Sequence, residues 1–184
     1  MQNKNIYIAS DHAGFDLKTK LLKNFPKIND LGTKTDESVD YPDFAHKLTK
    51  EVLKNKKNVG ILICGTGVGM SIAANRKKGI RAGLANNSKI ARLIRKHNDA
   101  NVLVLPGRFI NTSEAKKSVQ AFLSTKFESG RHKRLSLIHI SEPTRLLSIS
   151  YAVFCLIYEF TSSIISFTRI SFCIFICHNR TLSI

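Results

Sequence analysis

The chain has 184 residues, a hydrophobic fraction of 43% and a formal net charge of +16. This length suits one domain with or without an extension, and this composition excludes a wholly disordered chain. The positive charge is mostly lysine spread over several expected helices, with no arginine-rich arm or aromatic stacking motif. These features favour a solvated, lysine-rich surface that meets a small anionic substrate, and they argue against nucleic-acid binding.

The composition changes abruptly at Arg134. All 10 glycines and all 19 lysines precede this point, whereas residues 135–184 hold 10 isoleucines, 9 serines and three of the four cysteines. We therefore divide the chain into a domain, 1–134, and a tail, 135–184, whose composition is unusual for a domain. The longest uncharged run of the tail, Leu146–Tyr158, has 13 residues. A membrane span needs about 20 residues, so no membrane association is expected.

The cysteine content and the N-terminus point to a reducing compartment. Cys64 is the single cysteine of residues 1–134, so that segment can form no disulfide framework. Met1–Asn5 leads directly into a short apolar strand, without the pattern of a signal peptide. Both features predict a cytoplasmic protein.

The first half of the domain alternates apolar strands with amphipathic helices. Ile6–Ser10 and Ile28–Leu31 are expected strands, and Phe15–Phe25 is an expected helix with leucines at helical spacing between lysines. Pro42–Asn55 predicts a second helix, because its apolar residues share one face. Val59–Cys64 is apolar on both faces, as in a buried parallel strand.

The second half of the domain continues this alternation. The expected elements are strands Arg81–Leu84 and Val102–Leu105, and helices Met70–Arg76, Lys89–Lys96 and Asn111–Thr125. Ser88 is the expected cap of the helix Lys89–Lys96, and Thr112 or Ser113 that of the last helix. Strands that alternate with helices at short spacing predict a three-layer, Rossmann-like α/β sandwich around a five-stranded parallel sheet.

A glycine-rich turn, Cys64–Gly69, joins the strongest strand to the next helix. Its glycines let the backbone approach a ligand, and the helix N-terminus presents N–H groups to an anion. A dinucleotide-binding loop is a poor fit because the final glycine of GxGxxG is missing, and a plain connecting turn is the alternative. Cys64 itself is either a small buried hydrophobe or a thiolate favoured by the helix N-terminus.

Four further polar groups border the expected strands and helices: Asp11-His12, His97–Asn101, Gly107-Arg108 and Gly130–Arg134. A lone histidine in such a loop is usually structural or solvated, and each basic residue could be plain surface charge. We expect these groups to converge on the carboxyl edge of the sheet, where sites assemble. Together, the basic residues could clamp a phosphate.

Five motifs carry a resemblance to a known family. They are SDHAG (Ser10–Gly14), DYP (Asp40–Pro42), ICGTGVGMSIAAN (Ile63–Asn75), HNDAN (His97–Asn101) and GRH (Gly130–His132). In this order and spacing, they resemble the ribose-5-phosphate isomerase B family, whose sugar-phosphate isomerases also include galactose-6-phosphate isomerase subunits. The resemblance extends from about Asn5 to Arg134, and the CGTGVG and HNDAN pair is its most specific part.

The resemblance implies an aldose–ketose isomerase of the pentose phosphate pathway, which interconverts ribose 5-phosphate and ribulose 5-phosphate through an enediolate. No metal or organic cofactor is implied. Cys64 would be the base that moves the proton between C1 and C2, and His97 would open the furanose ring with Asp11 as its partner. The enediolate oxygens would be stabilised by the Thr66 hydroxyl and by the amides of Gly65, Gly67, Val68 and Gly69.

The resemblance also implies the remaining substrate contacts and an oligomer. The phosphate would be bound by His12, Arg108 and Arg131, and the sugar by Tyr41 and Asn98, with Asp11 nearby. Family members are homodimers or homotetramers whose sites are shared between subunits. Two alternatives stay open: an isomerase of hexose 6-phosphates such as allose or galactose 6-phosphate, and a sugar-phosphate-binding module that has lost turnover.

The end of the domain departs from the family. A second phosphate-binding arginine usually stands four residues after the first, where this chain has Leu135, and the family's last helix is replaced. The following segment, Leu135–Arg145, reads LSLIHISEPTR, which resembles a translated sequencing-library adapter. Our hypothesis is that the natural reading frame is interrupted near Arg134 and that residues 135–184 are artefactual or disordered. A real extension is the alternative.

Overall fold

The computed structural model describes residues 5–138. The strands are β1 (Ile6–Ser10), β2 (Asn29–Asp30), β3 (Val59–Cys64), β4 (Ala82–Leu84) and β5 (Val102–Pro106). The helices are α1 (Phe15–Asn24), α2 (Tyr41–Leu53), α3 (Val68–Asn75), α4 (Ser88–Asn98), α5 (Thr112–Ser124) and α6 (Gly130–Ile138), and a 3-10 turn, η1 (His12–Gly14), precedes α1. The strands form one parallel sheet of order β2-β1-β3-β5-β4, which confirms the predicted α/β class.

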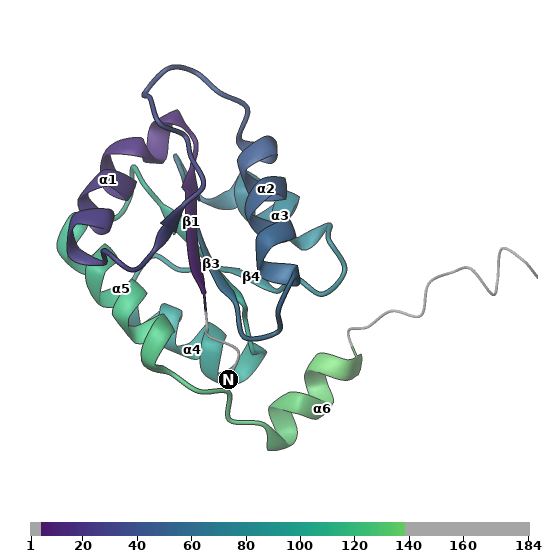
Figure 1. The fold of residues 1–184 in the computed structure, drawn as a ribbon. Helices are drawn as coiled ribbons and strands as arrows, with labels where there is room; N and C mark the ends of the chain where they lie inside the picture. The colour runs from purple at the N-terminus through teal and green to yellow at the C-terminus, as the bar shows by residue number, and fades with distance from the viewer. Residues whose placement is uncertain (1–4, 139–184) are drawn as a thin grey trace, which may run out of the picture. The chain divides into compact units, whose positions relative to one another are not determined.

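The central strand β3 explains the three layers, because all six of its residues are buried. Ile61 and Ile63 pack in a cluster with side chains of α1, α4 and α5, whereas Leu62 and Cys64 pack in a second cluster with α2 and α3. Figure 1 shows α1 and α5 on one side of the sheet and α2 and α3 on the other. The alternation of a strand therefore places Cys64 on the α2 and α3 side. Within residues 5–138, none of the helices has the length and apolarity to cross a bilayer.

Two predicted strands, Ile6–Ser10 and Val59–Cys64, are confirmed at the same bounds. The edge strand is shorter than expected and comprises only Asn29 and Asp30. Its predicted first residue, Ile28, belongs instead to the turn after α1, because its N–H donates to the Phe25 carbonyl at 3.1 Å.

The predicted helix caps are wrong by one residue. Asn87 caps α4 through a hydrogen bond from the Ile90 N–H at 2.9 Å, and Asn111 caps α5 through one from the Glu114 N–H at 2.8 Å. An asparagine before a serine or threonine competes well for the N-cap position. Ser88 instead donates its N–H to Glu114 Oε1 at 2.6 Å, and hydrogen bonds from the backbone and side chain of Ser88 lower the pKa of Glu114.

Helix α6 was not expected from the sequence. It begins at the GRH motif and continues past Arg134, so the change in composition falls inside a helix. Leu135 is therefore one turn after Arg131 on the same helix face. The adapter-like segment extends beyond residue 138 and so lies mostly outside the described residues. The interrupted reading frame stays a hypothesis that resequencing of the locus by an adapter-free method would test.

Candidate functional site

Cys64 ends β3 and faces the N-terminus of α3. Its side chain is buried, and its Sγ accepts a hydrogen bond from the Gly67 N–H at 3.2 Å. Gly67 has φ +80° as the N-cap of α3, and a Cβ at this position would collide with Leu84. The positive φ favours glycine here, whereas the end of the Leu84 side chain has room to shift. The sulfur therefore lies beside the N-terminus of α3, with the Gly67 amide as its donor.

Asp11 and Arg108 follow β1 and β5 at the same carboxyl edge. The N–H of Asp11 donates to the Ile63 carbonyl at 3.2 Å, and its buried carboxylate accepts from the Gly14 N–H at 2.9 Å. The N–H of Arg108 donates to the Gly65 carbonyl at 3.0 Å, and a Cβ on Gly65 would lie 3.5 Å from Arg108 Cδ. The Arg108 side chain is thus beside the glycine-rich turn, and the backbone of Asp11 is bonded to the strand that leads into it.

His12 and Tyr41 also reach this edge. The Nδ1 of His12 accepts from the Val39 N–H at 3.4 Å, and this bond favours the tautomer whose Nε2–H can donate to a ligand. A Cβ on Gly69 would lie 2.9 Å from Tyr41 Cζ, so the phenol packs against the glycine-rich turn. Thr66 is exposed, and its Oγ1 accepts from the Val68 N–H at 3.3 Å.

The HNDAN motif lies at the opposite edge of the sheet. It precedes β5, and its Asn101 carbonyl accepts from the N–H of Gly60 near the start of β3 at 2.9 Å. In the β3–β5 pairing, Gly60 is opposite Val102 and Cys64 is opposite Pro106, so about 13 Å of strand separates the two edges. The prediction that His97 and Asn98 converge with Cys64 is therefore wrong within one chain, because a loop before a parallel strand lies at its amino end.

The amino-edge cluster consists of His97, Glu128 and His132, together with Lys96. The Nε2 atoms of His97 and His132 lie 3.8 and 3.9 Å from Glu128 Oε2, and their rings stack with centroids 4.1 Å apart. Two imidazoles and a carboxylate are a possible set of zinc ligands. The carboxylate, however, is already paired with an ammonium group, because Lys96 Nζ lies 3.3 Å from Glu128 Oε2. We therefore infer no metal centre here.

Three residues of this edge were missed as site residues, although two of them stand inside quoted motifs. His132 is part of GRH, and Asp99 is part of HNDAN. Asp99 ends α4 with φ +46°, and its carboxylate accepts from Arg81 and Arg95, each at 2.6 Å. These bonds fix the end of the helix that carries His97. No sequence motif includes Glu128. It lies between α5 and α6 and approaches His97 only in the folded chain.

The family described as Ribose/Galactose Isomerase has a sequence profile that matches residues 6–137. The chain belongs to this family. A protein of Mycoplasma pneumoniae named "Probable ribose-5-phosphate isomerase B" is 48% identical over 137 residues, which are 72% of this chain and 90% of that protein.

Two solved structures of ribose-5-phosphate isomerases have a fold similar to that of this chain. The ribose 5-phosphate isomerase of Thermotoga maritima has a TM-score of 0.69 at 52% identity, over 73% of this chain and 96% of that chain. The ribose-5-phosphate isomerase B of Mycoplasma genitalium with bound ribulose-5-phosphate has a TM-score of 0.71 at 43% identity. That match covers 77% of this chain and 100% of the other.

Proposed function

We propose that this chain is an aldose–ketose isomerase that interconverts ribose 5-phosphate and ribulose 5-phosphate, as in the pentose phosphate pathway. The observation that carries the proposal is the match to the Mycoplasma genitalium structure with bound ribulose-5-phosphate, which covers all of that chain and 77% of this one. The carboxyl-edge geometry supports it, because a thiol beside a helix N-terminus is a suitable base for this chemistry. A free Cys64 suits a reducing compartment, so we propose that the enzyme is cytoplasmic.

Cys64 is assigned the proton transfer between the two carbons. Its thiolate takes the proton from C2 of the open-chain aldose and returns it to C1, while the proton of the C2 hydroxyl passes to the C1 oxygen. The Gly67 amide already donates to Cys64 Sγ, and the Val68 amide to Thr66 Oγ1. We therefore assign the enediolate oxygens to the Thr66 hydroxyl and to the amides of Gly65 and Gly69, where one such donor contributes about 3–4 kcal/mol.

We propose that two copies of the chain build each site. His97, the assigned ring-opening acid, lies about one strand length from Cys64 in a single chain, which supports its supply by a second copy. An exposed apolar surface supports a dimer. It includes Val68 and Ile72 on α3, which are 50% and 54% exposed, together with Leu84 and Phe109. This surface adjoins the glycine-rich turn, since Val68 belongs to both.

The substrate contacts divide between the two edges under this proposal. One copy supplies Asp11, His12, Tyr41 and Arg108, and the other supplies Asn98 and Arg131 next to His97. The phosphate would then be held by the Nε2–H of His12 and by arginines from both copies, which suit phosphate through their fork of donors. The whole reaction uses side chains and amides of the protein.

The direct test is to incubate the full chain with ribose 5-phosphate and, separately, with allose 6-phosphate, and to follow ketose formation. We expect turnover of the pentose with a kcat/KM at least about tenfold above that for the hexose, because the hexose has one carbon more than the sugar held by the Mycoplasma genitalium relative. Preference for the hexose would favour a hexose 6-phosphate isomerase. Binding of both sugars without turnover would favour a sugar-phosphate sensor.

Leu135→Arg is expected to strengthen substrate binding. Helix α6 places residue 135 one turn after Arg131, so the new guanidinium would share its face. A charged hydrogen bond to phosphate contributes about 1.5–3 kcal/mol, which corresponds to a KM for ribose 5-phosphate about 10–100-fold lower. Turnover of unphosphorylated ribose is the control and should not change. An unchanged KM for ribose 5-phosphate would remove residue 135 from the phosphate site.

A further inference from the structure

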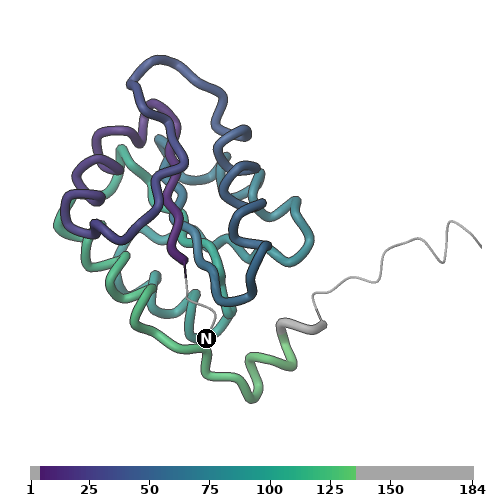
Figure 2. The backbone as a smooth tube through the Cα atoms, in the orientation of Figure 1, coloured from purple at the N-terminus to yellow at the C-terminus, as the bar shows by residue number. Residues whose placement is uncertain are grey.

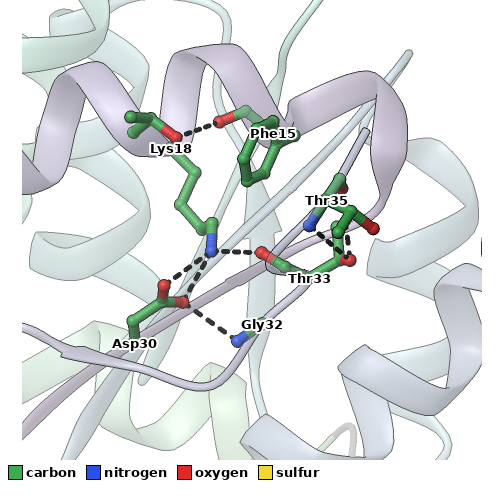
Figure 3. A network of polar contacts seen from close by, with 7 residues as sticks. Phe15, Lys18, Asp30, Gly32, Thr33 and Thr35 are labelled. Atoms are coloured by element: carbon green, nitrogen blue, oxygen red, sulfur yellow. Dashed lines mark hydrogen bonds and ion pairs between the residues drawn. The ribbon is translucent and has the colours of Figure 1, made fainter. Parts of the chain in front are cut away.

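Lys18 is the most buried charged side chain outside the proposed site. Its side chain is 1% exposed, although the sequence pattern suggested a solvated position on α1. Figure 3 shows its ammonium group between β2 and the segment that follows it. The Nζ donates to both carboxylate oxygens of Asp30 at 2.7 Å and to the Thr33 carbonyl at 2.6 Å. Three acceptors match the three protons of the ammonium group, so the buried charge is fully paired.

These bonds fix the start of the segment that joins β2 to α2. Asp30 Oδ1 also accepts from the Gly32 N–H at 2.9 Å. Gly32 and Thr33 are buried and pair with Ser10, the last residue of β1, through hydrogen bonds of 2.8 and 2.9 Å. Lys18 thus holds Thr33 against the strand that leads directly into Asp11 and His12.

The far end of the same segment contacts His12. The residues between, Lys34–Ser38, are exposed, whereas Val39 is half-buried and donates its N–H to His12 Nδ1 at 3.4 Å. Tyr41 follows two residues later at the start of α2 and packs against Gly69. In Figure 2 the segment forms the long loop that leads from β2 to α2. Both ends of the segment are therefore bonded to residues at the carboxyl edge.

We propose that Lys18 is a positioning residue for His12. With Asp30, it fixes Thr33 and thereby the loop whose Val39 N–H holds the His12 ring with Nε2 as the donor. Removing the ammonium group would leave Thr33 held by Ser10 alone, which loosens the start of the loop, weakens the bond from Val39 and lets the ring turn away from the phosphate. The consequence for catalysis rests on the function proposed above, whereas the consequence for the His12 ring does not.

Lys18→Met keeps the length of the side chain and removes its charge. We expect kcat/KM for ribose 5-phosphate to fall by about 10–100-fold, mostly through KM, since a misplaced binding group has effects of this size. Lys20→Met is the matched control, because Lys20 is on the same helix and forms an exposed pair with Asp16. It should retain the kinetics of the unmodified enzyme. If Lys18→Met does not fold, Asp30→Asn makes the same test, because Asp30 is one-third exposed.

A double-mutant cycle separates positioning from general damage. If Lys18 acts through His12, adding Lys18→Met to a His12→Ala variant should change kcat/KM by less than about twofold. Independent effects that multiply would overturn the proposal. So would a loss confined to thermal stability, with KM unchanged well below the melting temperature.

The histidine ring itself gives a readout that does not depend on turnover. In ¹H–¹⁵N spectra of the full chain, with the His12 signals assigned by their loss in His12→Ala, we expect an unprotonated Nδ1 and a protonated Nε2. Lys18→Met should mix the two tautomers, and Lys20→Met should not. An unchanged His12 spectrum in Lys18→Met would overturn the proposal, even if the chain lacks isomerase activity. Absent turnover with the expected spectra would instead count against the proposed function alone.

Discussion

Cys64→Ala is expected to lower kcat for ribose 5-phosphate by about 10²–10⁴-fold, the range that a single general base contributes. The thiol sits at the end of β3 with its sulfur 3.2 Å from the Gly67 N–H. An alanine side chain cannot carry the proton from C2 to C1. Single-turnover measurements in both directions should show the same loss, because one base acts in each.

Two controls test whether the loss of kcat in Cys64→Ala comes from the missing base. Binding of ribose 5-phosphate, measured by calorimetry, should persist in Cys64→Ala, because the assigned phosphate contacts are on other residues. Cys64→Ser keeps the shape of the side chain, but its hydroxyl stays protonated at neutral pH, so it should be nearly as inactive as the alanine variant. A serine variant with near-normal kcat would contradict the role of Cys64 as the base.

The parts of the fold that the sequence predicted best are those with a continuous apolar run. Strands β1 and β3 are buried along most of their length, so their ends coincide with changes to polar residues. The helix caps were harder, because Asn87 and Asn111 stand beside Ser88 and Thr112, which are also good caps. Only the observed hydrogen bonds distinguish such neighbours.

The carboxyl-edge residues were predictable because they follow strands of a parallel sheet. His97 lies elsewhere because its motif precedes β5, and a loop before a parallel strand lies at the amino end of the sheet. Lys18 is buried, although the lysines of this helix were expected to be solvated. It stands beside Leu17 and three residues before Leu21, so it shares the buried face of α1, and its partner Asp30 is distant in the sequence.

His97→Asn is the second variant with a large expected effect. Asparagine keeps a polar side chain at the end of α4 but cannot act as the acid that opens the furanose ring. We expect kcat/KM for ribose 5-phosphate to fall by about 10²-fold or more. The stability of the fold should change little, because His97 is one-third exposed and its contacts are with other partly exposed side chains.

Mixing the two variants tests the shared site most directly. Cys64→Ala and His97→Asn chains are unfolded together, refolded and assayed with ribose 5-phosphate. Random pairing makes half of the dimers hybrids, each with one intact site of two, so activity should recover to about one quarter of the unmodified enzyme. Cys64→Ala mixed with His12→Ala is the control and should not recover, because both residues belong to the same edge. Recovery in the first mixture alone is the predicted result. A first mixture as inactive as its components would contradict a site built from two copies of the chain.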